Sequence, residues 1–225
     1  MKRILTVIAC ALMAATFTFA QDEARSEKAP SFGFGARAAF DYALMYGFSD
    51  DDENVDADPK GIGFEAGIML RAQMIPNLNF APEINFSYVS TSHQYLEKDR
   101  TYMSMDLEIP LLIRGTVAER FYVTAGPQLN LNLSSDYDYD SEAEYIEEKV
   151  EPTTFTFGLA AGAGFNIVEG LFVDLRYYMG LMDLYPDVKS AEDTDNATEV
   201  EMYSNISMKG AKMMKFKVGL SYWFL

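Results

Sequence analysis

The chain has 225 residues and a formal net charge of −16, from 34 acidic and 18 basic side chains. This charge excludes nucleic acid as a partner, because nucleic acids are bound through basic side chains. The length fits one domain. The single cysteine, Cys10, lies close to the start, so we expect neither disulfides nor a cysteine metal site in the rest of the chain.

The first 20 residues have the pattern of a secretory signal peptide. Lys2 and Arg3 precede a mainly apolar run over 4–19, and Ala20 supplies a small residue for cleavage. We predict that 1–20 is removed and that 21–31 forms a flexible polar segment. An uncleaved membrane anchor is the alternative, but the run is short for a span. Lipid attachment at Cys10 is disfavoured because too few apolar residues precede it.

Beyond the leader, the dominant pattern is an apolar residue at every second position. It holds through eight stretches: 32–44, 62–74, 78–88, 103–113, 121–133, 155–167, 171–181 and 214–224. Side chains of a β-strand alternate between its two faces. The pattern therefore predicts eight strands, each with one wholly apolar face.

The intervening positions indicate which face is outside. They carry many glycines and charged side chains, which is typical of a polar barrel interior surrounded by an apolar, lipid-facing exterior. We therefore predict an all-β fold over 32–225, an eight-stranded antiparallel up-and-down transmembrane β-barrel, located in the cell outer membrane. A soluble barrel of lipocalin type is the alternative, and it would have to enclose the whole apolar set in a small core.

The predicted connections alternate between short and long. The short ones are 75–77, 114–120 and 168–170, and the long ones are 45–60, 89–101, 134–152 and 182–212. Outer-membrane barrels have short periplasmic turns and long extracellular loops. Most of the acidic residues fall in or beside these long segments, so we expect four long extracellular loops, several of them strongly acidic.

The inward positions contain as many basic as acidic side chains. These are Arg37, Arg71, Arg114, Arg176, Lys215 and Lys217 against Asp41, Glu65, Glu83, Asp106, Glu108 and Asp174. Buried charges persist only when they are paired, so we expect a salt-bridge network that closes the lumen. A water-filled pore lined by charge is the alternative. Glycines share this inward face, where they leave room for long side chains.

Two further patterns suggest chemistry at the loops. Asp136, Asp138 and Asp140 alternate along an acidic segment and are weak candidates for a metal site, although a disordered, solvated loop is the favoured interpretation of so acidic a segment. The only histidine, His93, has Ser90, Ser92 and Glu97 nearby, which is the residue set of a Ser–His–acid hydrolase at the outer leaflet, although a solvated loop histidine is the favoured interpretation. An unchanged lipid A acyl pattern in a His93→Ala variant would exclude it.

Several short motifs carry a family resemblance. They read LEIPLLIR at 107–114, AGP at 125–127, AGAGF at 161–165 and LRYYMGL at 175–181. In this order and spacing they resemble the PorT-like family of outer-membrane β-barrel proteins. The resemblance implies an eight-stranded outer-membrane barrel, usually of unassigned biochemical role.

The end of the chain resembles the sorting strand of barrels delivered by the outer-membrane assembly machinery. Such strands alternate and finish on an aromatic residue, whereas here Leu225 follows the aromatic. The sorting strand consists of Phe216, Val218, Leu220, Tyr222 and Phe224.

From these patterns we expect a non-enzymatic outer-membrane protein without a cofactor, in a structural or surface-interaction role. The alternatives are a narrow passive porin-like channel and an outer-leaflet lipid-modifying enzyme. The expected partners are outer-membrane lipids, lipopolysaccharide, the barrel assembly machinery and an extracellular ligand at the loops.

Overall fold

A computed structural model describes residues 32–47, 55–95, 98–139, 153–184 and 210–224. The predicted signal peptide, Cys10, the segment 21–31, Asp140 and large parts of the predicted acidic loops lie outside the described residues. Within the described ranges there is no helix of the length and apolarity that a bilayer span requires.

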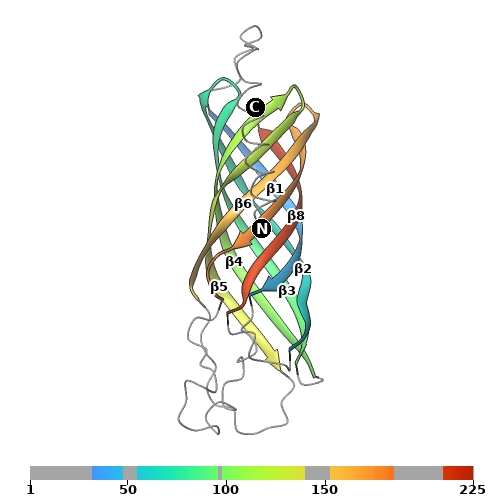
Figure 1. The fold of residues 1–225 in the computed structure, drawn as a ribbon. Coiled ribbons are helices and arrows are strands. Elements are labelled where there is room, and N and C mark those ends of the chain that lie inside the picture. The colour runs from blue at the N-terminus through green and yellow to red at the C-terminus, as the bar shows by residue number, and fades with distance from the viewer. Residues whose placement is uncertain (1–31, 48–54, 96–97, 140–152, 185–209, 225) are drawn as a thin grey trace, which may run out of the picture.

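Eight strands make up nearly all of the described chain. They are β1 (Phe32–Tyr46), β2 (Val55–Ile75), β3 (Leu78–Tyr95), β4 (Lys98–Ala118), β5 (Phe121–Tyr139), β6 (Phe155–Val168), β7 (Leu171–Gly180) and β8 (Lys212–Phe224). Consecutive strands pair antiparallel, and β8 pairs with β1, so the sheet closes into the tilted barrel of Figure 1. The predicted fold class is confirmed.

The barrel has two different ends, which we call the turn end and the loop end. The turn end lies at the top of Figure 1 and holds tight turns at Pro76-Asn77, Glu119-Arg120 and Glu169-Gly170. Asn77 (φ 64°) and Gly170 (φ 80°) have the left-handed backbone conformation that tight hairpins favour. Strands β1, β3, β5 and β7 end at the loop end.

The two faces of the barrel wall are those of a membrane barrel. Apolar side chains on the outside are strongly exposed, as at Leu175 (65%) and Val218 (51%). Charged side chains on the inside are buried, as at Asp41 (0%), Glu108 (0%) and Lys217 (2%). This distribution is the reverse of a soluble barrel, in which the apolar face fills the core. The soluble alternative is therefore excluded.

The strands β2 to β5 are longer than the sequence pattern predicts, and they extend at the loop end. The connection expected at 89–101 is instead a continuation of β3 and β4, paired from Ser90↔Met103 to Tyr95↔Lys98. At the other end β4 continues to Ala118, which shortens the connection expected at 114–120 to a two-residue turn. Strands β2 and β4 have 21 residues each, about 70 Å of chain at 3.3 Å per residue. A tilted strand needs about half that length to cross a bilayer, so this wall projects beyond the membrane.

Inward glycines provide the space that large lumen side chains occupy. The Tyr122 ring lies over Gly164, its partner across β5 and β6, and a Cβ at position 164 would be 2.1 Å from that ring. A Cβ at Gly219 would be 2.4 Å from the Arg37 guanidinium. Both glycines therefore act by being small, which allows charged and aromatic groups to pack inside a narrow barrel.

Candidate functional site

The middle of the lumen is occupied by the side chain of Lys217, from β8. Its ammonium group contacts the carboxylates of Glu65 and Glu108 and lies 3.8 Å from Asp41. These three carboxylates come from β2, β4 and β1, and their oxygens lie within 4.8 Å of one another. Because Lys217 lies among them, a resident cation already occupies the position where a metal ion would bind.

Glu108 connects this group to the neighbouring strands. It accepts a hydrogen bond from Lys215 Nζ at 2.7 Å and another from Gln128 Nε2 at 2.9 Å. Lys215 also donates to Ser87 Oγ at 3.2 Å. The carboxylate of Glu108 is thus surrounded by donors from β5 and β8, which compensates the cost of burying it.

A second group of charges continues towards the turn end. Arg37 contacts Glu65 and donates to Asp174 at 2.8 Å. Arg176 binds Glu83 through two hydrogen bonds of 2.8 and 3.1 Å and lies 3.9 Å from Asp174. This is a bidentate pair, in which two guanidinium nitrogens each donate to one oxygen of the carboxylate. Through Arg37, the two groups form one continuous network.

We call these nine side chains the lumen network. They are Arg37, Asp41, Glu65, Glu83, Glu108, Asp174, Arg176, Lys215 and Lys217, all at most 5% exposed. Each belongs to the set that the sequence placed on the inward face. Packed side chains of this length fill the cross-section of an eight-stranded barrel.

Three of the predicted inward charges are not in the lumen network. Arg71 and Arg114 lie near the turn end and stack on aromatic rings, and Asp106 lies near the loop end, where it accepts hydrogen bonds from Ser104 and Asn132. The equal number of inward charges therefore does not mean that they pair one to one. The lumen network itself contains five carboxylates and four cations.

Sequence reasoning missed the aromatic side chains inside the barrel. Tyr102, Tyr122, Tyr178 and Trp223 are all at most 4% exposed. Tyr178 accepts a hydrogen bond of 2.6 Å from Asn130 Nδ2, and Tyr122 stacks on the Arg114 guanidinium at 3.5 Å. The available signal was their spacing: Tyr102, Tyr178 and Trp223 each lie an even number of positions from a predicted inward charge on the same strand. Tyr122 has no such charge on β5, but it lies an even number of positions from the inward Gly126.

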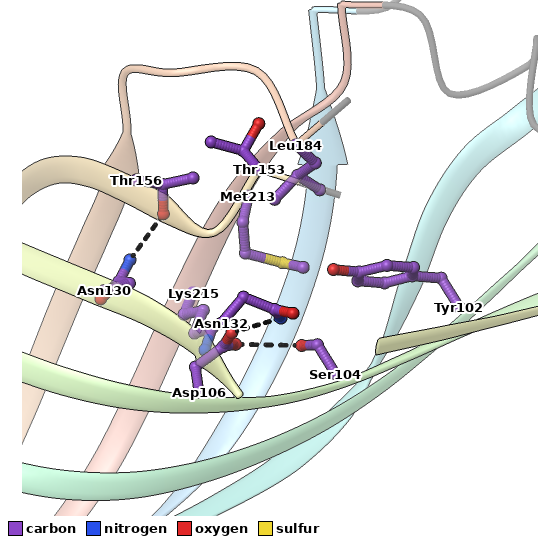
Figure 2. A pocket seen from close by; sticks show the side chains of 10 residues that line it. All are labelled: Tyr102, Ser104, Asp106, Asn130, Asn132, Thr153, Thr156, Leu184, Met213 and Lys215. Atoms are coloured by element: carbon purple, nitrogen blue, oxygen red, sulfur yellow. Dashed lines mark hydrogen bonds between the residues drawn. The ribbon is translucent and has the colours of Figure 1, made fainter. Parts of the chain in front are cut away.

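A small polar cavity of about 20 Å³ lies in the lumen near the loop end. Figure 2 shows Asp106 bonded to Ser104 (3.0 Å) and Asn132 (2.9 Å), and Asn130 bonded to Thr156 (3.4 Å). The lining is completed by Tyr102, Thr153, Leu184, Met213 and Lys215. This volume holds about one water molecule, so the cavity does not continue as a channel through the lumen network.

The remaining candidate residues lie on β3, β5 and β8. Asp136 is an exposed residue of β5, where the sequence predicted a loop, and Asp138 follows on the same strand. The backbone of His93 lies in β3 opposite Arg100, also in a segment expected to be a loop. The sorting strand forms the outward face of β8 as predicted, with Phe216, Val218, Leu220, Tyr222 and Phe224 between 43% and 51% exposed.

Comparison with known families agrees with this architecture. The model of the outer membrane protein beta-barrel domain matches residues 19–185. The chain belongs to this family. As an outer-membrane barrel, it is located in the outer membrane.

The chain is similar to several solved structures at low sequence identity. Neisserial surface protein A is 14% identical with a TM-score of 0.51, over 85% of this chain and 97% of that one. The outer membrane protein OprG of Pseudomonas aeruginosa is 10% identical with a TM-score of 0.45, over 86% and 96%. Ail, the attachment invasion locus protein of Yersinia pestis, is 13% identical with a TM-score of 0.40, over 87% and 100%. No curated protein matches the sequence.

Proposed function

We propose that this outer-membrane barrel is a closed anchor that presents its loop end to the outside for surface interactions. The observation that carries the proposal is the lumen network, in which charges from β1, β2, β3, β4, β7 and β8 bind one another across the barrel. Opening a pore through it would separate buried ion pairs, which costs several kcal/mol for each uncompensated charge. A narrow passive channel is thereby disfavoured.

The barrel architecture suggests which part meets a partner. In outer-membrane barrels the short turns face the periplasm, so the projecting wall of β2 to β5 would stand outside the cell. On β3 the outward-facing apolar residues end at Tyr88, and the polar residues Ser90 and Ser92 take the next two outward positions. Lipopolysaccharide is a partner of suitable chemistry, since acidic loops and lipid phosphates can share divalent cations.

The finer features of the sequence complete the proposal. The motifs at 107–114 and 175–181 support membership of the PorT-like family. The leader supports export by signal peptide, and the alternating outward face of β8 supports recognition by the barrel assembly machinery. The role is non-enzymatic and requires no cofactor. The family and the structural likeness supply a membrane scaffold and name no reaction.

Conductance tests the closed lumen. The barrel refolded and inserted into a planar bilayer should give no steady single-channel currents, because the lumen network fills the cross-section. A large porin inserted under the same conditions serves as the positive control. Large, long-lived openings of this protein would favour the channel and overturn the closed anchor.

Surface labelling tests the orientation. In a Cys10→Ala background, we expect an Asp136→Cys variant to react with a membrane-impermeant maleimide on intact cells, because Asp136 is exposed near the loop end. A Glu119→Cys variant, in the turn between β4 and β5, should react only after the outer membrane is permeabilised. The opposite pattern would invert the barrel and remove the surface role.

A further inference from the structure

The turn end of the lumen holds two arginines beside the same indole ring. The guanidinium carbon of Arg71 lies 4.9 Å from the centre of the Trp223 ring, and that of Arg114 lies 5.8 Å from it. Arg114 also stacks on Tyr122 at 3.5 Å and on Phe172 at 4.5 Å. Aromatic faces therefore hold both cations in defined positions.

Neither arginine forms an ion pair with an acidic side chain of the described residues. The nearest carboxylates along the lumen, Glu83 and Asp174, are bound by Arg176 and Arg37 instead. Arg114 is only 8% exposed, whereas Arg71 is half-buried and lies near the turn end of β2. Placing two buried or half-buried cations close together costs free energy unless an anion compensates their charge.

The same region contains polar atoms that have no hydrogen-bond partner. They are Arg71 Nε, Trp223 Nε1 and Thr124 Oγ1, and Thr124 is the cross-strand neighbour of Arg114. All three can donate a hydrogen bond. A buried donor without an acceptor costs about 1–3 kcal/mol, so this group of donors indicates that an acceptor binds here.

We propose that Arg71 and Arg114, with Trp223 and Thr124, form an anion seat that takes a phosphate group at the turn end of the lumen. Two guanidinium forks and neutral donors suit a tetrahedral oxyanion with several acceptor oxygens. The glycine at position 33 keeps the approach to Arg71 open, since a Cβ there would be 3.2 Å from Arg71 Nε.

The phosphate can come from two sources. One is a soluble phosphate or phosphate ester in the compartment that the turn end faces. The other is the headgroup of a phospholipid in the adjacent leaflet, because Arg71 is half-buried and lies near the turn end of β2. The phosphate group recognised is the same in both cases. The two sources are therefore distinguished by titrating the protein with a soluble phosphate and, separately, with a phospholipid.

Trp223 is the only tryptophan of the chain, and its fluorescence reports directly on this seat. The full barrel in neutral maltoside micelles is titrated with inorganic phosphate, with phosphatidylglycerol added to the micelles, and with sodium chloride at matched ionic strength. We expect a saturable change in Trp223 emission with phosphate, with phosphatidylglycerol or with both, and none with chloride. A response to inorganic phosphate identifies the soluble source, and a response to the lipid alone identifies the headgroup.

Variants separate the seat from a general charge effect. Arg71→Gln should weaken the apparent affinity about tenfold or more, because it removes charge-assisted hydrogen bonds. Arg71→Lys should restore part of the affinity, and Arg120→Gln, in an exposed turn at the same end, should leave it unchanged. Heat-modifiable gel mobility verifies that each variant forms the barrel. No response to either phosphate source, an equal response to chloride, or an unchanged titration in Arg71→Gln would overturn the proposal.

Discussion

Replacing Lys217 by Met is expected to lower the free energy of unfolding by about 3–5 kcal/mol, the usual cost of removing one partner of a buried ion pair. The ammonium group of Lys217 is shared by Asp41, Glu65 and Glu108, and all four side chains are at most 2% exposed. Methionine has a similar length to lysine, so the change in the free energy of unfolding reports mainly the loss of the positive charge. Urea titration of the refolded barrel, followed by Trp223 fluorescence and gel mobility, measures it.

The matched control is Lys60→Met. Lys60 lies on β2 and is exposed, so its replacement should change the stability by no more than about 0.5 kcal/mol. Adding Glu108→Gln to Lys217→Met should recover part of the loss, because one of the stranded carboxylates is removed and the two effects are coupled. If Lys217→Met lowered the free energy of unfolding no more than Lys60→Met does, the lumen network would not stabilise the barrel.

Replacing Val218 by Arg is expected to cost about 2–4 kcal/mol, as for cations on the lipid face at mid-bilayer depth. Val218 is 51% exposed on the outside of β8, and its neighbours in register are Phe40 on β1 and Leu175 on β7. This row lies near the middle of the shorter strands, where the bilayer core must be. Unfolding titrations in lipid bilayers measure the cost.

Depth provides the control for this prediction. Phe32→Arg, at the start of β1 and 61% exposed, should cost about 0–1 kcal/mol because the position lies near the membrane interface. Equal costs at the two positions would show that the apolar outer face is not in contact with the hydrocarbon core.

The alternation of apolar residues was sufficient to predict the strands, because a lipid-facing position tolerates no charge along the whole span. It failed at Ser90 and Ser92, where β3 continues beyond the bilayer. In water a strand needs only hydrogen-bonded neighbours, so pairing with β4 continues after the apolar pattern ends. The same reason explains why Asp136 lies in a strand and not in a loop.

The pairing of the inward charges was not predictable in the same way. Alternation places Lys217 and Glu108 inside the barrel, yet they are far apart in sequence and their strands, β8 and β4, are not neighbours in the sheet. Arg71 and Arg114 carry the same kind of charge as Arg37 and Arg176, but aromatic rings, and not carboxylates, face them. Whether an inward arginine meets a carboxylate or an aromatic ring depends on the register between strands.

The sequence by itself determined the number of strands, their antiparallel order and which face meets lipid, because period-two alternation is a local property that the bilayer enforces at every position. Only the tertiary structure decided that Lys217 is shared by three carboxylates, that the loop-end wall projects, and that two arginines at the turn end form no ion pair with the acidic side chains of the described residues. Closure of the barrel and its stagger bring together side chains from opposite walls, and no single strand contains that information.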